Sequence, residues 1–276
     1  MRTAVGIIVC LISGPLSAQW LNYPTPGIPR LPDGKPDRAA PVPRTADGKP
    51  DLSGIWGVPC PIGNALIGGF NGLPTTYCAT EVAIPPEFAN IGQSIKGGLP
   101  YQPWAKDLVM KTRENNRPND PLSRCLPTGI VRLDVFPLFR KVIQVPGLVV
   151  MLNELHASYR QIFTDGRPLP VDPNPSWNGY STGKWDGDTL VVETTGLRDG
   201  LWMDTGGSPL TDAARITEKF RRVSYGTLEI ELTIDDPKAY TKPWTILVKQ
   251  IVAPDTELLD YICAENEKDV RHLQSK

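Results

Sequence analysis

The residues ITEKFRRVSYGTLEIELTI, from Ile216 to Ile234, decide the fold class of this chain. Two alternating runs of apolar and polar side chains flank Tyr225 and Gly226, which have the character of a short turn between two strands of a β-hairpin. In the second run the even-numbered residues from Leu228 onward are apolar, and their neighbours are Thr or Glu. Because strand side chains alternate between two faces, this run predicts a strand with one buried and one solvated face.

Similar patterns recur along the rest of the chain. A strand is expected over residues 139–145, followed by a long strand or a bent pair over 148–163. Asp186-Gly187-Asp188 has the composition of a tight hairpin turn, and a final hairpin is expected to join 244–252 to 257–263. Strands joined by short turns predict a mainly β fold, namely an antiparallel, calycin-like β-barrel or a strongly curled sheet.

The amino end has the layout of a secretory signal peptide, expected over residues 1–18. Arg2 precedes an apolar stretch of about a dozen residues, too short to span a bilayer, and small residues precede a cleavage site near Ala18. No later stretch is long and apolar enough to cross a membrane. The sequence therefore predicts a secreted or periplasmic protein without a membrane span.

The mature chain divides into an arm and one domain. Residues 19–50 are rich in proline, glycine and charged side chains, a composition typical of an extended arm or linker. Residues 51–276 are expected to form a single barrel-like domain with long loops. One helix is expected near 103–115, because Pro103 suits a first helical turn and apolar residues then follow on one face.

Cysteine usage agrees with export. Cys10 lies in the signal segment, which leaves Cys60, Cys78, Cys125 and Cys263. Four cysteines allow three pairings, of which the simplest joins Cys60 to Cys78 and Cys125 to Cys263. The alternative is a metal site, but the chain has no C-x-x-C motif and only two histidines. We therefore expect disulfides and no metal.

Charge and motifs exclude several classes of function. Removal of Arg2 with the signal leaves a net charge of −2, which offers no electrostatic footprint for nucleic acid or an anionic membrane. No glycine-rich phosphate loop follows a predicted strand, so no nucleotide cofactor, or other cofactor, is expected. No serine lies in a G-x-S-x-G motif, which disfavours a triad-type serine hydrolase.

Several segments resemble those of a family of exported bacterial proteins with no settled activity. They are DGKPDLSGIW at 47–56, GKWDGDTLVVET at 183–194 and DDPKAYTKPW at 235–244. The resemblance covers most of the mature chain and implies no catalytic role that could be transferred to particular residues. Separately, Gly54-Ile55-Trp56 resembles the G-x-W opening of lipocalin-type barrels, which implies a calycin-like barrel.

A polar group interrupts the apolar run at 148–163. With period-two spacing over one strand, Glu154, His156 and Arg160 share a face with Leu148 and Ile162. Inside a barrel, Glu154 would orient His156 as a general base, and Arg160 would hold a carboxylate or an oxyanion. The alternative is a structural ion pair with a satisfied histidine, or a strand whose polar end leaves the core.

Two further groups of side chains are candidates for binding or for surface structure. Aromatic residues in or beside loops would stack on a flat ligand at the barrel mouth, or would seal the ends of the core: Trp177, Tyr180, Trp185 and Trp202. Charged residues of the central hairpin are expected to form a solvated cross-strand ladder: Glu218, Arg221, Arg222, Glu229 and Glu231.

The sequence thus favours an exported β-barrel that binds a small molecule in a cavity with a polar Glu/His/Arg cluster. A cofactor-independent enzyme, such as a hydrolase, lyase or isomerase with His156 as base, is the main alternative. A cell-envelope interaction module that uses the proline-rich arm is the third. The oligomeric state, the ligand and the strand order stay open.

Overall fold

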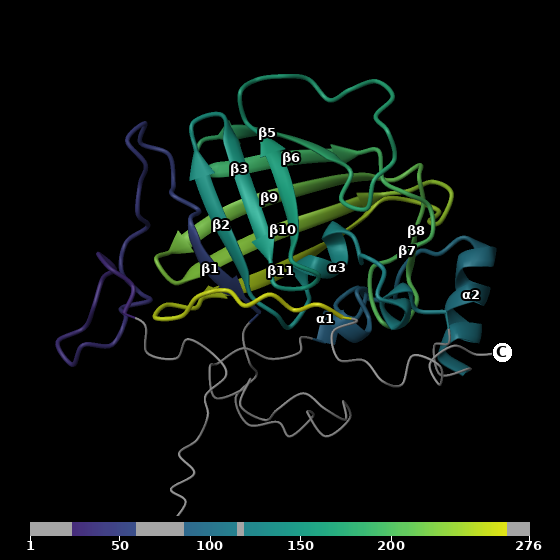
Figure 1. The fold of residues 1–276 in the computed structure, drawn as a ribbon. Coiled ribbons are helices and arrows are strands. Elements are labelled where there is room, and N and C mark those ends of the chain that lie inside the picture. Colours follow the sequence, from purple (N-terminus) through teal and green to yellow (C-terminus); the bar gives the residue numbers. More distant parts are fainter. Residues whose placement is uncertain (1–23, 59–85, 115–118, 264–276) are drawn as a thin grey trace, which may run out of the picture.

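A closed β-barrel forms the body of the protein in the computed structural model, which describes residues 24–58, 86–114 and 119–263 (Figure 1). Nine strands follow one another around the wall in the order β1-β11-β10-β9-β6-β5-β4-β3-β2, and β2 pairs with β1 to close the ring. The prediction of a mainly β, barrel-like fold is confirmed.

The wall strands are β1 (Gly54–Gly57), β2 (Arg140–Val145), β3 (Leu148–Asn153), β4 (Ser158–Phe163), β5 (Tyr180–Asp186), β6 (Thr189–Thr195), β9 (Arg215–Ser224), β10 (Thr227–Asp235) and β11 (Trp244–Val252). A small sheet joins β7 (Leu201–Trp202) to β8 (Pro209–Leu210). The helical segments are α1 (Pro86–Ala89), α2 (Pro103–Glu114), the 3₁₀ helix η3 (Pro121–Arg124) and α3 (Ile130–Asp134). Figure 1 shows these helices and the small sheet gathered on one side of the barrel, with the arm on the opposite side. The helix expected near 103–115 is α2.

The β9–β10 hairpin has the register that its alternating pattern predicts. Ile216 faces Ile234 and Phe220 faces Ile230 across the hairpin, and all four side chains are buried in the barrel core. Outward side chains of the same strands carry the charges, including the ion pair of Lys219 with Glu231 at 2.7 Å. This division of apolar and charged faces supplies the main hydrophobic driving force of the barrel.

One join in the wall is parallel and short, and we call it the β4–β5 seam. Only two residue pairs connect the strands, Ile162 with Ser181 and Phe163 with Thr182. The crossing over residues 164–179 brings the chain back so that β5 runs in the same direction as β4. The other eight joins are antiparallel as predicted. The β4–β5 seam and the β1–β11 join, each with two residue pairs, are the shortest ladders of the described wall.

The apolar run at 148–163 is a bent pair of strands and not one long strand. Asn153 pairs with Ser158 across a turn formed by residues 154–157. His156 and Ala157 have φ angles of 60° and 46°, the left-handed conformation that reverses the chain here.

The turn also changes which residues face inward. In β3 the odd-numbered Val149 and Met151 are buried, whereas in β4 the even-numbered Arg160 and Ile162 are buried. The expectation that residues from Leu148 to Ile162 share one face is therefore wrong, because the spacing of two per face holds only within a single strand.

Residues 253–263 do not form the second arm of the predicted last hairpin. The free edge of β11 pairs with β1 instead, and the Ala253 N–H donates to the Ile55 carbonyl at 2.8 Å. Pro254 has no N–H to continue the ladder, and Asp255 adopts a φ of 60°. The chain therefore leaves the wall after β11.

The arm contains two copies of one turn. RLPDGKPD and RTADGKPD begin at Arg30 and Arg44, and in both the Arg side chain donates to the carbonyl of the Gly four residues later, at 3.0 and 2.8 Å. The two guanidinium groups then pair with carboxylates of the barrel rim, Arg30 with Asp255 at 2.6 Å and Arg44 with Asp188 at 2.7 Å. These exposed pairs position the arm and contribute little to stability, because water and salt screen them.

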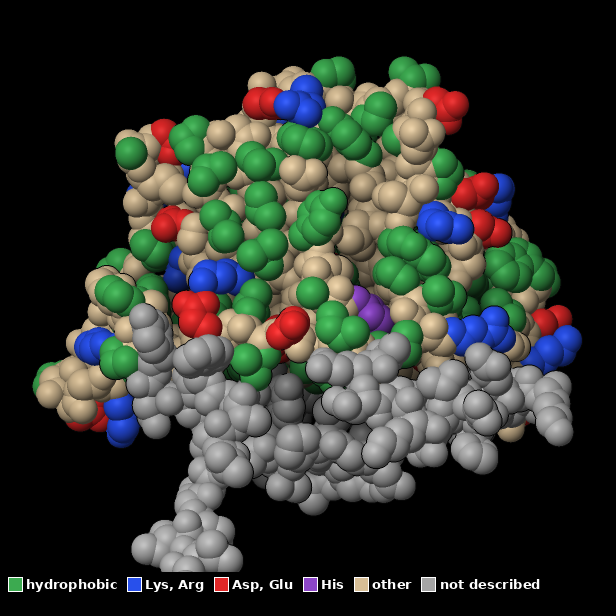
Figure 2. Space-filling model, in the orientation of Figure 1, with side chains coloured by type: hydrophobic (Ala, Val, Ile, Leu, Met, Phe, Trp, Pro, Cys, Tyr) green, Lys and Arg blue, Asp and Glu red, His purple; other side chains and the backbone are tan. Residues whose placement is uncertain are grey.

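The outer wall over β2, β3 and β4 is rich in exposed apolar side chains. Figure 2 shows hydrophobic side chains gathered over these strands, and Ile143, Val145 and Tyr159 are each more than a third exposed. None of the helices in the described ranges is both long enough and apolar enough to span a bilayer.

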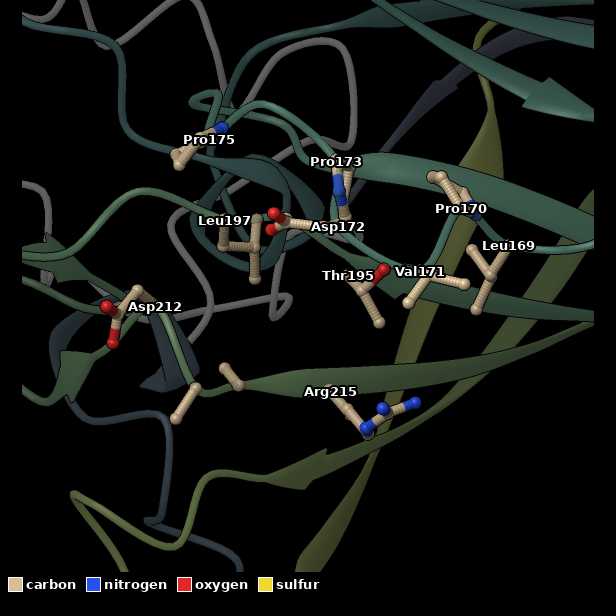
Figure 3. A pocket seen from close by; sticks show the side chains of 13 residues that line it. Leu169, Pro170, Val171, Asp172, Pro173, Pro175, Thr195, Leu197, Asp212 and Arg215 are labelled. Atoms are coloured by element: carbon tan, nitrogen blue, oxygen red, sulfur yellow. The ribbon is translucent and has the colours of Figure 1, made fainter.

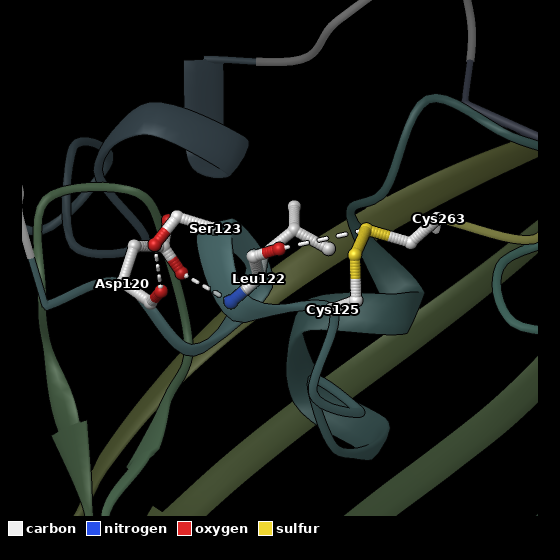
Figure 4. Close-up of a disulfide and its surroundings, with 5 residues drawn as sticks. All are labelled: Asp120, Leu122, Ser123, Cys125 and Cys263. Carbon is white, nitrogen blue, oxygen red and sulfur yellow. Dashed lines mark hydrogen bonds between the residues drawn. A yellow bond between two sulfur atoms is a disulfide. The ribbon is translucent and has the colours of Figure 1, made fainter. Parts of the chain in front are cut away.

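A disulfide between Cys125 and Cys263 ties the segment after η3 to the end of the described chain (Figure 4). Cys125 stands in a left-handed conformation directly after η3, and Asp120 caps that helix by accepting from the Leu122 N–H at 2.9 Å. The predicted Cys125–Cys263 pairing is confirmed. Cys60 and Cys78 lie outside the described residues, so their pairing stays a prediction.

Replacement of both Cys125 and Cys263 by Ser is expected to lower the free energy of unfolding by about 2–5 kcal/mol, since the bond closes a loop of 138 residues and restricts the unfolded chain. Urea unfolding followed by circular dichroism would measure the loss. Wild-type protein treated with a reductant should shift at least as far, since the reductant also opens the predicted Cys60–Cys78 bond, and an unchanged midpoint in both would contradict the role given to the Cys125–Cys263 bond.

Candidate functional site

The inner face of the barrel carries polar side chains among its apolar ones, and we call this set the lumen cluster. Its members are all buried: Asp134, Arg140, Asn153, Arg160, Ser181, Thr194, Glu218 and Gln250. Seven come from inward positions of the wall strands, and Asp134 comes from the carboxyl end of α3. Burial of charge is costly unless each group is paired, so the hydrogen-bond partners within the cluster decide what it can do.

Arg160 and Glu218 form the central ion pair of the lumen cluster. Arg160 Nη1 donates to Glu218 Oε1 at 2.9 Å, and Arg160 Nη2 donates to Glu218 Oε2. Arg160 also reaches Ser181 Oγ at 3.1 Å and Thr194 Oγ1 at 2.9 Å. Burial lowers the pKa of Arg160, but the charge and hydrogen bonds of Glu218 more than compensate, so its pKa lies above the usual value. Arg160 is therefore charged and fully engaged.

Asp134 and Arg140 form a second ion pair beside the first. Asp134 Oδ1 lies 2.6 Å from Arg140 Nη2, although the angles fall outside those of a hydrogen bond. Gln250 Nε2 donates to the Asp134 backbone carbonyl at 2.9 Å, which ties β11 to the end of α3. Arg140 also lies within 3.7 Å of Met151 Sδ and 3.5 Å of the Leu133 carbonyl. The two guanidinium groups thus have partners on several sides.

Two acceptors of the lumen cluster have neither a hydrogen bond nor an ion-pair contact. In the described part of the chain, Asp134 Oδ1 at least lies against Arg140, whereas Asp134 Oδ2 and Gln250 Oε1 meet no donor, and both side chains are at most 2% exposed. A buried acceptor without a donor costs about 1–3 kcal/mol. Such groups in a native protein call for an explanation, and a ligand that donates hydrogen bonds is one.

Asp134 is the carboxyl group of this cluster with a displaced pKa. Burial, the largest influence, and the nearby charge of Glu218 raise its pKa, whereas Arg140 and Arg160 lower it, and the result is a pKa of about 6. Asp134 is therefore poised to exchange a proton near neutral pH, which is typical of functional sites but also occurs in structural networks.

Glu154 and His156 do not join Arg160. Glu154 Oε2 accepts from the Phe139 N–H at 3.0 Å and Oε1 from the Leu259 N–H at 3.1 Å, so backbone amides occupy both carboxylate oxygens. Burial raises the pKa of Glu154 and lowers that of the half-buried His156. The two side chains stand in the β3–β4 turn and form no acid–base pair. A catalytic role for either residue stays a prediction without geometric support.

The four predicted ligand-binding aromatic residues lie in different surroundings. Trp202 is buried on β7, and Trp185 packs against the core from β5. The guanidinium of Arg198 lies over the ring of Trp177, 4.8 Å from the ring centroid. Tyr180 stacks on Phe163 with ring centroids 5.2 Å apart. Three of them contribute to the core, since Trp177 also packs against it, and the four do not converge on one ligand site.

Sequence reasoning missed Glu218 because it placed this residue in an exposed ladder. The ladder exists on the outer wall, where Arg221 pairs with Glu229 at 2.6 Å, but Glu218 and Arg222 are buried inside. The signal was present, since Glu218 has the same parity as the buried Ile216. Arg140 and Gln250 likewise alternate in phase with buried residues of β2 and β11.

Comparisons with known proteins add no assignment to this geometry. No family model matches the chain, and no match was found among curated proteins or solved structures. Within the described ranges, no group of three or more His, Cys, Asp or Glu side chains is arranged to hold a metal ion. The inference about function therefore rests on the lumen cluster itself.

Arg160→Met should lower the free energy of unfolding by about 3–5 kcal/mol, because it leaves Glu218 buried without a countercharge. The double variant Arg160→Met with Glu218→Leu should recover much of that loss. Arg221→Met, which breaks an ion pair on the outer wall, is the matched control and should cost less than about 1 kcal/mol. Equal losses for Arg160→Met and Arg221→Met in urea unfolding would contradict the central role of this pair.

Asp134→Asn should change how stability depends on pH. Because the folded-state pKa of about 6 exceeds the ordinary value of 3.8, Asp134 contributes stability at low pH that is lost as pH rises through 6. The variant lacks this loss, so its free energy of unfolding relative to wild type should increase from pH 4.5 to pH 7.5. Asp165→Asn is the control, since the Arg167 contact lowers the pKa of Asp165 and reverses the sign.

Proposed function

We propose that this protein is an exported barrel that binds a small molecule at the lumen cluster, through hydrogen-bond donors of the ligand. The observation that carries this proposal is the pair of buried acceptors without donors, Asp134 Oδ2 and Gln250 Oε1. A ligand amine or hydroxyl placed between them would satisfy both, and its apolar part would face the surrounding core.

The architecture supports a binding role. A barrel of eight or more strands has an interior that either fills with side chains or holds one small ligand. Here the interior combines large apolar residues with eight buried polar ones, which is the composition of a site that fixes the orientation of a partly apolar ligand. A packing role alone would not require acceptors that lack donors.

The charge balance favours donors over anions as ligand groups. Arg160 is occupied by Glu218, Ser181 and Thr194, and Arg140 faces the carboxylate of Asp134. With Asp134 ionised, two carboxylates balance two guanidinium groups. A further anion would have to displace one of these pairs, whereas an amine or a hydroxyl uses only the free acceptors.

Export is part of the proposal and has separate support. The Cys125–Cys263 disulfide is the kind of bond that persists in oxidising compartments, and it agrees with the signal-like sequence at the amino end. The enzyme alternative has no comparable support, because backbone amides occupy both oxygens of Glu154 and none of the described carboxylates pairs with His156.

Binding would be tested with probes that share one alkyl chain: hexylamine, hexanol and hexanoate, titrated into the full-length mature protein by calorimetry. The amine or the alcohol should bind, and hexanoate should bind more weakly. Gln250→Met removes one free acceptor and should weaken binding about tenfold or more, the cost of one unmet buried hydrogen bond.

Gln161→Met is the matched control, since Gln161 lies on β4 with its side chain exposed. It should bind the probes as wild type does. Preferential binding of hexanoate, or equal affinity of the Gln250→Met and Gln161→Met variants, would overturn the proposal. Thermal unfolding of each variant without probe would show that the comparison is made between folded proteins.

A further inference from the structure

A groove lies outside the barrel, away from the lumen cluster. The crossing between β4 and β5 passes over the wall so that residues 169–175 face residues 195–197 and 212–215. The space between them measures about 610 Å³, within the range of small-molecule clefts. Figure 3 shows Asp172, Thr195 and Leu197 along one side of the groove and Asp212 and Arg215 along the other.

The wall formed by the crossing is held firmly in place. Gly196 has a φ of 70°, and a Cβ atom there would stand 2.4 Å from Cγ of Pro173, so only glycine permits this close approach. The Ser176 N–H donates to the Gly196 carbonyl, and the Arg198 N–H donates to the Ser176 carbonyl, each at 2.9 Å. Three prolines restrict the rest of the segment, which favours a preformed site.

The charged side chains of the groove differ in how they are engaged. Lys238 holds Asp212 at 2.6 Å, so this carboxylate is neutralised. Asp172 and Arg215 have no ion pair and no side-chain hydrogen bond to any described residue, and the buried Thr195 Oγ1 also lacks a partner. The groove therefore offers one free negative group and one free positive group, with a hydroxyl in addition.

The remaining lining is apolar and extended. Leu169, Val171 and Leu197 contribute aliphatic side chains beside the prolines. Residues 169–175 form no hydrogen bond with other described residues, so their backbone N–H and C=O groups are free to meet a ligand. Free backbone groups beside aliphatic side chains suit a peptide-like molecule.

We infer that this groove is a second binding site, for a small zwitterion such as a dipeptide with aliphatic side chains. Asp172 pairs with the ammonium group, and the guanidinium of Arg215 donates two parallel hydrogen bonds to the carboxylate. The aliphatic side chains of the ligand pack against Leu169 and Pro173, which are both partly exposed. A ligand with a single charge would leave either Asp172 or Arg215 unpaired, and so would bind more weakly.

The test uses three probes of similar size, titrated into the full-length mature protein by calorimetry. They are leucyl-leucine, its N-acetyl derivative, which lacks the ammonium, and its methyl ester, which lacks the carboxylate. Leucyl-leucine should bind about tenfold more tightly than either derivative, since each lacks one charge-assisted contact. Absence of leucyl-leucine binding at 10 mM, or equal affinity for all three, would overturn the inference.

Variants identify the site. Asp172→Asn should weaken leucyl-leucine binding about tenfold but leave the affinity for the N-acetyl derivative unchanged. Arg215→Gln should likewise weaken leucyl-leucine binding about tenfold but leave the affinity for the methyl ester unchanged. Arg221→Gln, on the outer wall of the hairpin, is the control and should bind as wild type does. Asp134→Asn should also leave leucyl-leucine binding unchanged, so failure here is distinguishable from failure of the lumen proposal. Loss of binding in Asp134→Asn but not in Asp172→Asn would place the dipeptide in the lumen and reject the groove.

Discussion

The buried ion pair of Arg160 and Glu218 links the barrel wall across one of its two shortest strand pairings. Only two residue pairs join β4 to β5, and a barrel with one thin seam would be open there to water and to other strands. Arg160 extends from β4 across this seam to Ser181 on β5 and Thr194 on β6, and ends on Glu218 of β9. One side chain thus connects four strands across a join that has only two backbone pairs.

This arrangement explains why charge is retained in a core that could be apolar. A hydrophobic replacement of a buried ion pair is often neutral or stabilising, so stability alone does not require Arg160 and Glu218. Directional bonds, in contrast, fix the lateral position of strands that share little backbone pairing. The same two charges act on Asp134 in opposite directions: burial is the main reason for its raised pKa, the charge of Glu218 adds to the rise, and Arg160 lowers it.

The sequence predicted those features that are determined locally. The alternating residues 216–234 were sufficient for a hairpin, and the pattern near 103–115 for a helix, since each pattern lies within one element. The prediction that Glu154 and Arg160 share one face of a strand was wrong, because the left-handed turn at His156 ends the strand and interrupts its alternation. The sequence could not predict that the members of the lumen cluster meet. Asp134 and Arg160 come close to Glu218 only through the order of distant strands around the ring, which no local pattern specifies.

The order of strands has a consequence for how the chain folds. β1, the first strand, sits between β2 and β11, the last strand, with Trp56 opposite Val252. Ring closure must therefore wait until nearly the whole polypeptide is present, and contacts so distant in sequence make for slow folding. During this delay the ring stays open. The open intermediate exposes the edges of β1 and β10 and is the species that chaperones would have to protect from aggregation.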